Sequence, residues 1–339
     1  HKALENDFGF DEQIWQELAE LGLPSALLPP DAGGFGGSGE DISILFEAFG
    51  KSLLVEPFIP TVMLGAWSVY LAGGQEELLE QVLSGQKQLA FACTEPNGRY
   101  DVFHCSTNYA NGTLQGQKSV VMNANVADEI LVVARHSGNV GDRDGVGLYL
   151  VDRNHPNLQV RAYGTIDAGH AADIQLKDCP AICLIEDASD VLDKVLAGAT
   201  LALCAEALGA MEFCKDTTID YLKTRKQFGK NLGSFQVLQH RMVDLVIEIE
   251  QVRSAIMLAA AHLGQDALHR DLHVSAAKSL VGRVAKLVSE ETIQMHGGIA
   301  MCWEYDVAHY AKRLVMIDHQ LGDADHHLDR FVSLSREAS

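Results

Sequence analysis

The C-terminal segment gathers side chains of the types that bind metal ions. It reads Gly322-Asp323-Ala324-Asp325-His326-His327-Leu328, and Asp and His are both metal ligands. Two adjacent histidines on a helix point in different directions, so a single ion would not contact both. An Asp at the first position of a helix caps the free N–H groups there. A helix that begins at Asp323 or Asp325 therefore explains the pattern better, and we predict no metal site.

The cysteines offer a second kind of chemistry, but their spacing does not favour it. No Cys-x-x-Cys pair occurs, and an odd number of loosely spaced cysteines fits free thiols better than a disulfide framework. Free thiols persist in a reducing compartment, so we expect a cytoplasmic protein. The seven positions are Cys93, Cys105, Cys179, Cys183, Cys204, Cys214 and Cys302.

Composition and charge narrow the class of protein. The chain has 339 residues, of which 47% are hydrophobic, and this suffices for two or three domains or for one large bundle with an insertion. The formal net charge of −20 disfavours nucleic-acid and anionic-membrane partners. No apolar run reaches the roughly 18 residues of a membrane span. The sequence opens His1-Lys2-Ala3 without a Met or a signal-like stretch, so we expect it to be the ordered part of a longer chain.

The spacing of hydrophobic residues changes twice along the chain and predicts three domains. Residues 1–88 and 186–339 repeat apolar side chains at helical spacing, and the second region does so in three long segments typical of an antiparallel bundle. Residues 89–185 contain short β-type runs separated by turn residues, as in a small barrel or sandwich. The fold class is therefore α+β and multidomain. The predicted strands are 89–93, 119–121, 129–134, 147–151 and 158–162.

Three further segments form a more specific pattern. They are Thr94-Glu95-Pro96, Arg225 through Gln227-Phe228-Gly229 to Phe235-Gln236, and Gln294-Met295-His296-Gly297-Gly298 with Arg313 beyond it. Each resembles a signature segment of the acyl-CoA dehydrogenase family, and they occur in that family's order. The resemblance covers essentially the whole chain. It implies the family's fold, with an N-terminal helical domain, a middle β-barrel or sandwich and a C-terminal four-helix bundle.

The resemblance also implies FAD as cofactor and an acyl-CoA thioester as substrate. In the family the flavin ring lies between the β domain and the bundle, and the ADP tail reaches a neighbouring subunit. Arg225 is then assigned to the phosphates or adenine edge of that tail, where a guanidinium makes two hydrogen bonds. Alternatively, Arg225 pairs with a surface acid, Phe228 is part of the core and Gly297-Gly298 only ends a helix. The other cofactor residues that the resemblance implies are Thr94, Phe228, Gln236, Gln294, Gly297 and Gly298.

The middle domain departs from the family where the flavin ring would lie. Thr94-Glu95-Pro96 is followed by residues 97–101, Asn-Gly-Arg-Tyr-Asp, rather than by the usual Gly-Ser-Asp turn. The family's Lys-x-Trp-Ile-Thr/Ser segment begins here at Lys118, with Val120 in place of the Trp and Met122 in place of the hydroxyl that bonds flavin N5. Neither side chain donates that hydrogen bond. The flavin site is weakened or repurposed, unless another group compensates.

Both positions at which the family places its catalytic base lack a carboxylate. The reaction needs one to remove the α-proton while flavin N5 takes the β-hydride. The usual position is occupied here by Leu321, and the less common position, on the first bundle helix, by Ala199. Glu206 lies two turns beyond Ala199 on roughly the same face and is a weak candidate, or else a structural acid.

Three functions remain open. The pattern resembles the small subunit of hetero-oligomeric dehydrogenases of the pimeloyl-CoA and steroid side-chain-CoA type, in which a homologous dehydrogenase subunit is the partner and one subunit can lack the base. Alternatively, the chain is a homo-oligomer of the same fold with other flavin chemistry, such as a flavin monooxygenase. The third possibility is a non-catalytic scaffold subunit. The acyl group is not specified by the sequence.

Overall fold

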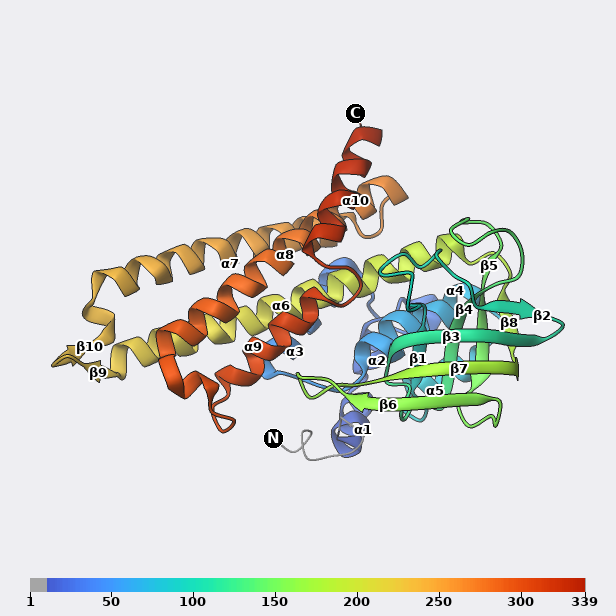
Figure 1. Ribbon diagram of the computed structural model, residues 1–339, viewed down its shortest axis with the longest axis horizontal. Coiled ribbons are helices and arrows are strands. Elements are labelled where there is room, and N and C mark those ends of the chain that lie inside the picture. Colours follow the sequence, from blue (N-terminus) through green and yellow to red (C-terminus); the bar gives the residue numbers. More distant parts are fainter. Residues whose placement is uncertain (1–10, 339) are drawn as a thin grey trace. The chain divides into compact units, whose positions relative to one another are not determined.

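Figure 1 shows the computed structural model of the chain, which describes residues 11–338. The chain divides into two compact units. The first takes in His1–Gly37 and Val55–Ala199, and the second takes in Ser38–Leu54 and Thr200–Ser339. Helices, then strands, then helices follow one another along the chain, and this order confirms the predicted fold class.

The helices of the first unit precede its sheet in the sequence, apart from the first turns of α6 (Ser189–Thr224). Asp11 begins the first of them, because its carboxylate accepts hydrogen bonds from the backbone N–H groups of Gln13 and Ile14. Trp15 of this helix is almost fully buried, and its Nε1 donates to the Gly85 carbonyl at 3.0 Å. A Cβ at Gly85 would lie 2.5 Å from the Ala19 side chain, so only glycine fits that contact. The elements are α1 (Glu12–Glu20), α2 (Leu23–Ala26), η2 (Pro30–Ala32), η3 (Ile59–Ala66), α4 (Trp67–Ala72) and α5 (Glu76–Leu83).

The strands of the first unit join into one eight-stranded sheet. Its order is β6-β7-β3-β2-β4-β5-β8, and β1 pairs with β4 in parallel. All five predicted runs overlap observed strands, and β2, β7 and β8 are additional. The sequence pattern of β7 is hard to recognise because Asp173, Gln175 and Lys177 alternate with the buried Ala172, Ile174 and Leu176. The strands are β1 (Leu89–Ala92), β2 (Asn108–Ala110), β3 (Thr113–Met122), β4 (Glu129–Arg135), β5 (Val146–Asp152), β6 (Leu158–Gly164), β7 (His170–Pro180) and β8 (Ile182–Ile185).

The second unit is a helical bundle with a short hairpin at one end (Figure 1). The apolar residues that predicted α7 and α8 are buried apart from the half-buried Leu238, and they include Leu245 and Ile249 on α7 and Val281 and Val288 on α8. The elements are α3 (Gly39–Ser52), α6 (Ser189–Thr224, from Thr200 on), β9 (Lys226–Gln227), β10 (Lys230–Asn231), η4 (Leu232–Ser234), α7 (Gln236–His262), α8 (Ala267–His296), η5 (Gly297–Met301), α9 (Val307–Asp318) and α10 (Ala324–Glu337).

Helix α3 packs backbone against backbone on α6, although it lies early in the sequence. A Cβ at Gly50 would lie 1.9 Å from the carbonyl oxygen of Glu206, and a Cβ at Gly209 would lie 2.0 Å from that of Glu47. Both sites therefore require glycine. This is why residues 38–54 group with the bundle rather than with the other N-terminal helices.

The start of α10 confirms the capping interpretation of the C-terminal segment. The Asp323 carboxylate accepts the backbone N–H of His326 at 2.8 Å. His327 is buried, and its Nε2 lies 2.9 Å from the Leu321 carbonyl oxygen. None of the helices within residues 11–338 has both the length and the apolar composition needed to cross a membrane.

Candidate functional site

A two-residue hairpin at the end of α6 presents Phe228 to solvent. Gln227 of β9 pairs with Lys230 of β10, and the turn residues Phe228 and Gly229 have φ values of 53° and 79°. Positive φ at both central residues is the geometry of a tight hairpin turn, and it is rare for a bulky residue such as Phe. The Phe228 side chain is 89% exposed. It is therefore not part of the core, and the turn holds an aromatic ring outward at some conformational cost.

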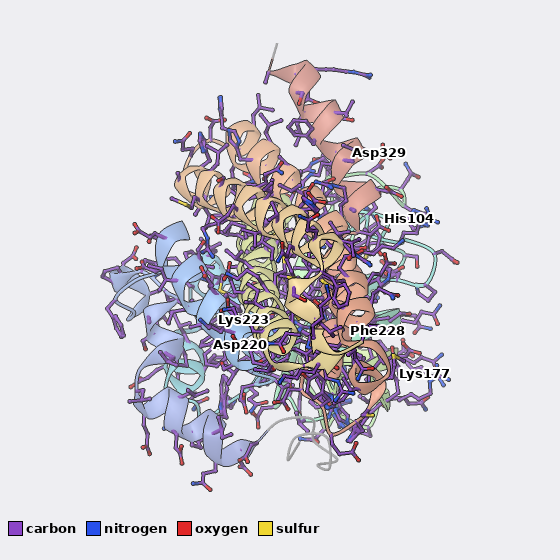
Figure 2. All side chains as sticks on the ribbon, turned by 90° about the vertical axis from the view of Figure 1, so that its left-hand side faces the viewer. His104, Lys177, Asp220, Lys223, Phe228 and Asp329 are labelled. Atoms are coloured by element: carbon purple, nitrogen blue, oxygen red, sulfur yellow. The ribbon has the colours of Figure 1, made fainter. Side chains whose placement is uncertain are left out.

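Positive charge surrounds this hairpin, which below is called the basic hairpin (residues 223–236). Lys223, Arg225 and Lys226 are exposed, and the Lys230 ammonium lies 4.2 Å from the centre of the Phe235 ring. Within residues 11–338 no carboxylate pairs with Arg225, so the interpretation of Arg225 as a partner of a surface acid finds no support. Figure 2 looks onto this end of the bundle, where Lys223 and Phe228 project. A local cluster of cations on an acidic chain fits an anionic ligand.

The end of α8 joins the basic hairpin at the same end of the bundle. The Tyr221 hydroxyl donates to the His296 carbonyl at 3.2 Å, and the two rings lie 4.5 Å apart. Gly297 follows with a φ of 71°, and a Cβ at Gly297 or Gly298 would meet no atom within 4 Å. The backbone here is open to a ligand on its outer side. The two segments predicted to bind the cofactor tail are thus brought together within the second unit.

His296 is a buried residue of this site whose role the sequence did not reveal. Its Nδ1 lies 2.9 Å from the Thr292 carbonyl oxygen and donates to it, which leaves Nε2 without a partner among the described residues. Burial lowers the pKa of His296, so the ring is neutral near pH 7. An unpartnered acceptor beside the Gly297-Gly298 backbone fits a ligand that carries a hydrogen-bond donor.

Apolar side chains continue the same surface beyond Gly298. Met301 is 73% exposed and Trp303 is 51% exposed, and the Lys312 ammonium lies 4.3 Å from the centre of a Trp303 ring. Exposed aromatic rings, cations and open glycine backbone are the groups that bind a nucleotide carrying phosphates. The predicted residues Gln236 and Gln294 are both exposed, as such contacts require.

The strands of the first unit retain a buried ion pair next to Thr94. The Glu95 carboxylate accepts Lys118 Nζ at 2.8 Å, Thr107 Oγ1 at 2.7 Å and the Ser106 backbone N–H at 2.8 Å. Burial alone would raise the pKa of Glu95, but the charge of Lys118 and these hydrogen bonds hold it well below its usual range. The pair ties β3 to the chain that follows β1. Thr94 itself contributes its carbonyl, which accepts the Ser119 N–H at 2.9 Å.

Val120 lies at an irregularity of β3 and faces solvent. The pairing of β3 with β7 shifts between Lys118 and Val121, and Val120 has a φ of 54° and is 53% exposed. A β-branched residue is strained in that conformation. The Val120 N–H donates to Asp173 Oδ1 at 3.3 Å, and this oxygen also accepts the Tyr163 hydroxyl at 3.2 Å. Neither Val120 nor the half-buried Met122 supplies a hydroxyl. The hydroxyl of Tyr163 already donates its hydrogen bond to Asp173.

Glu206, the acid predicted as a weak candidate for the base, is engaged in an ion pair. Arg313 binds both oxygens of Glu206, with Nε–Oε1 at 2.5 Å and Nη2–Oε2 at 2.8 Å, and Glu206 is only 5% exposed. Ala199 is fully buried on α6. The role of Glu206 as a base stays a prediction, but its geometry is that of a structural acid.

Leu321 occupies a turn that a buried lysine holds in place. Lys278 is fully buried, and its Nζ donates to the carbonyls of Asp318 at 3.0 Å and Gly322 at 2.5 Å. Leu321 has a φ of 55° in this turn between α9 and α10. Asp318 accepts the Ala324 N–H at 3.1 Å. The turn that carries Leu321 is therefore held by hydrogen bonds from a buried ammonium.

Comparisons with known proteins connect both units to one family. The model of the acyl-CoA dehydrogenase C-terminal domain matches residues 190–328, and that of the middle domain matches residues 90–179. The chain is 30% identical over 315 residues to the acyl-CoA dehydrogenase IpdE2 of Mycobacterium tuberculosis, which covers 92% of this chain and 83% of that protein.

Solved structures extend the likeness to the fold. A variant of the steroid acyl-CoA dehydrogenase Tcur3481-Tcur3483 superposes with a TM-score of 0.88 at 31% identity, over 99% of this chain and 92% of that chain. The ChsE4-ChsE5 complex from Mycobacterium tuberculosis also gives a TM-score of 0.88, at 24% identity, over 99% of this chain and 91% of that chain. The FAD complex of PigA gives 0.88 at 22% identity, over 97% of this chain and 91% of that chain. The last two likenesses concern the fold alone.

Proposed function

The chain belongs to the acyl-CoA dehydrogenase family of oxidoreductases, and we propose that it is one subunit of a hetero-oligomer whose partner is a homologous dehydrogenase subunit that carries the catalytic base. The reaction of the assembly is the α,β-dehydrogenation of an acyl-CoA thioester. One observation carries the proposal. Leu321 and Ala199 stand at both base positions, while Glu206, two turns beyond Ala199 on α6, has both oxygens bound by Arg313.

The residues at the hairpin end of the bundle support a role in holding the ADP tail of FAD, the family's cofactor. Arg225 would bind its phosphates or adenine edge, with Gln236 and Gln294 as hydrogen-bonding neighbours. Gly297 and Gly298 would let the backbone approach, and Phe228 would contact an apolar part of the ligand. When bound, FAD supplies the acceptor for the substrate hydride.

The first unit fits the flavin ring less well. Val120 and Met122 offer no hydroxyl donor, and Thr94 is the remaining candidate contact on this side. We therefore propose that the ring lies on the partner subunit while the basic hairpin of this chain holds the tail. The assembly would then contain fewer FAD molecules than chains. The steroid acyl-CoA dehydrogenase Tcur3481-Tcur3483, which is named for two proteins, supports a pairing of unlike chains.

The two subunits then have different tasks in the reaction: one removes the proton and the other holds the cofactor. The partner's carboxylate removes the α-proton of the thioester, because this chain offers no free acid at either position. This chain positions the cofactor and adds positive charge next to its phosphates. The seven unpaired cysteines support a reducing, cytoplasmic location.

A comparison of the isolated chain with the co-expressed pair tests the proposal. Each homologous dehydrogenase subunit of the source genome is co-expressed in turn, and FAD per chain and acyl-CoA-dependent bleaching at the flavin absorbance are measured. We expect FAD retention and bleaching only in one pair, with about half an FAD per chain. Full dehydrogenase activity of the isolated chain would overturn the proposal. Activity with reduced flavin and oxygen would favour a monooxygenase instead, and an active partner unaffected by this chain would favour a scaffold.

A further inference from the structure

Helix α7 carries apolar side chains on the side that its buried residues do not occupy. Five large ones are between 36% and 67% exposed, and all lie on the face opposite to the buried residues of the helix. Two pairs of them are separated by eleven residues, which is close to three turns of an α-helix, so each pair lies along one line. The five residues form a single stripe, the α7 stripe, made of Val243, Val246, Ile247, Met257 and Leu258.

Glu250 lies at the middle of the α7 stripe. It follows Val243 by seven residues and precedes Met257 by seven, and a seven-residue repeat keeps side chains on one face of a helix. Its side chain is 59% exposed. If α7 of a second copy of this chain covered both apolar ends of the stripe, in either the parallel or the antiparallel direction, Glu250 would meet its own equivalent. Two identical stripes therefore bring like charges together at the centre of their contact, which disfavours that pairing.

The side chains around Glu250 do not neutralise its charge. The Arg253 guanidinium approaches it, with Nε at 3.6 Å from Glu250 Oε2. The same guanidinium binds Glu47 of α3 at 3.0 Å and Glu212 of α6 at 2.8 Å. Lys215 also binds Glu212, so two cations are shared among three carboxylates. The middle of the stripe thus keeps an excess of negative charge, and a partner with a cation at this point complements it.

We infer that the α7 stripe binds the homologous dehydrogenase subunit, and that Glu250 selects this unlike chain over a second copy; the inference rests on the proposed hetero-oligomer. The matching helix of the partner would place apolar side chains opposite both ends of the stripe and a Lys or Arg opposite Glu250. Burial of the apolar side chains supplies the affinity. A charged residue at one position of a contact between helices determines which chain is bound and in which register.

The first test uses the homologous subunit that co-purifies with the chain. The two full-length chains are purified separately, and the affinity is measured by fluorescence titration. Val246→Asp and Met257→Asp each place a charge at one end of the stripe, and we expect either to weaken binding by about tenfold or more. Val315→Asp makes the same change at an exposed valine of α9 and should bind like the wild type. Unchanged affinity in both stripe variants would overturn the inference, while the pair itself and the proposed function would stand.

The second test needs no partner subunit. Wild-type and Glu250→Lys chains are mixed, and sedimentation measures how tightly the mixed pair and each like pair form. Glu opposite Lys replaces two like charges, so we expect the mixed pair to be about tenfold tighter than either like pair. Glu80→Lys reverses an exposed charge on α5 and should give no such preference.

Two results of the second test would overturn the inference. Equal affinity of the mixed and like pairs would show that Glu250 does not select the partner. A wild-type chain that pairs with itself as tightly as with the homologous subunit would identify a second copy as the occupant of the stripe. If no homologous subunit co-purifies, the proposed function fails, and the preference of the mixed pair still reports on the stripe.

Discussion

The basic hairpin of the second unit and the β3 region of the first unit carry signature segments of the same family, yet they differ in what has been kept. At the basic hairpin, the residue types that would contact a ligand persist: Arg225 is unpaired by any described carboxylate and Phe228 is held outward. At β3, the Lys118–Glu95 pair is buried, while the side chains of Val120 and Met122 carry no hydrogen-bond donor for a ligand. The ion pair stabilises the strands whether or not a ligand binds. Its presence therefore gives no evidence that a flavin binds beside it.

The buried pair of the first unit gives the largest expected effect. Lys118→Met leaves the Glu95 charge buried without its partner, and we expect a loss of about 3–5 kcal/mol in the free energy of unfolding. Urea unfolding measures it. The double variant Lys118→Met with Glu95→Gln should recover much of the loss. If the single variant is as stable as the wild type, the pair is not what holds β3, and the contrast between the two regions fails at that point.

The buried pair of the second unit is expected to matter for stability and not for the reaction. Glu206→Gln in the active pair leaves Arg313 with one accepting oxygen, and we expect a loss of about 3 kcal/mol in unfolding free energy. The rate of acyl-CoA-dependent bleaching should change less than twofold. A loss of bleaching without a loss of bound FAD would instead identify Glu206 as the base.

The cation of the basic hairpin should affect the ligand and not the fold. Arg225→Gln removes a bidentate contact to an ionised group, and we expect FAD binding by the pair to weaken by about 1.5–3 kcal/mol. Equilibrium dialysis of the stripped pair against FAD measures this. Lys286→Gln makes the same charge change at an exposed site of α8 and should leave FAD affinity within about 0.5 kcal/mol of the wild type.

The smallest expected effect comes from replacing the two side chains with positive φ, Val120 and Phe228. Val120 and Phe228 are both exposed with a φ near 54° and 53°, so replacing either with Gly should stabilise the isolated chain by about 1 kcal/mol. Only Phe228→Gly should weaken FAD binding by the pair. If Val120→Gly weakens it equally, the β3 region still contacts the cofactor, and the two regions are more alike than proposed.

Local patterns carried most of what the sequence could predict. The cap at Asp323, the apolar faces of α7 and α8 and five of the strands depend on neighbours close in sequence, and all are present. The grouping of α3 with the bundle depends on Gly50 and Gly209, whose role appears only once two distant helices touch. A run such as β7 hides its apolar alternation among Asp, Gln and Lys.

The candidate site also has features that the sequence could predict and features that it could not. The resemblance pointed to Arg225, Gly297 and Gly298, and the structure places the segments that carry them at one end of the bundle through the Tyr221–His296 hydrogen bond. The positive φ of Val120 and of Phe228 could not be predicted, because each is imposed by strand pairing rather than by residue preference. The unpartnered Nε2 of His296 likewise follows from burial that no short pattern records.

The contact of α3 with α6 has a consequence for synthesis. Gly50 emerges from the ribosome long before Glu206, and most of the first unit is translated between them. Residues 38–54 must therefore wait, with the apolar side chains of Phe46 and Phe49 uncovered, until the first bundle helix has been made. A nascent chain stalled before residue 200 would present this helix as a chaperone-binding segment, and a longer one would hide it.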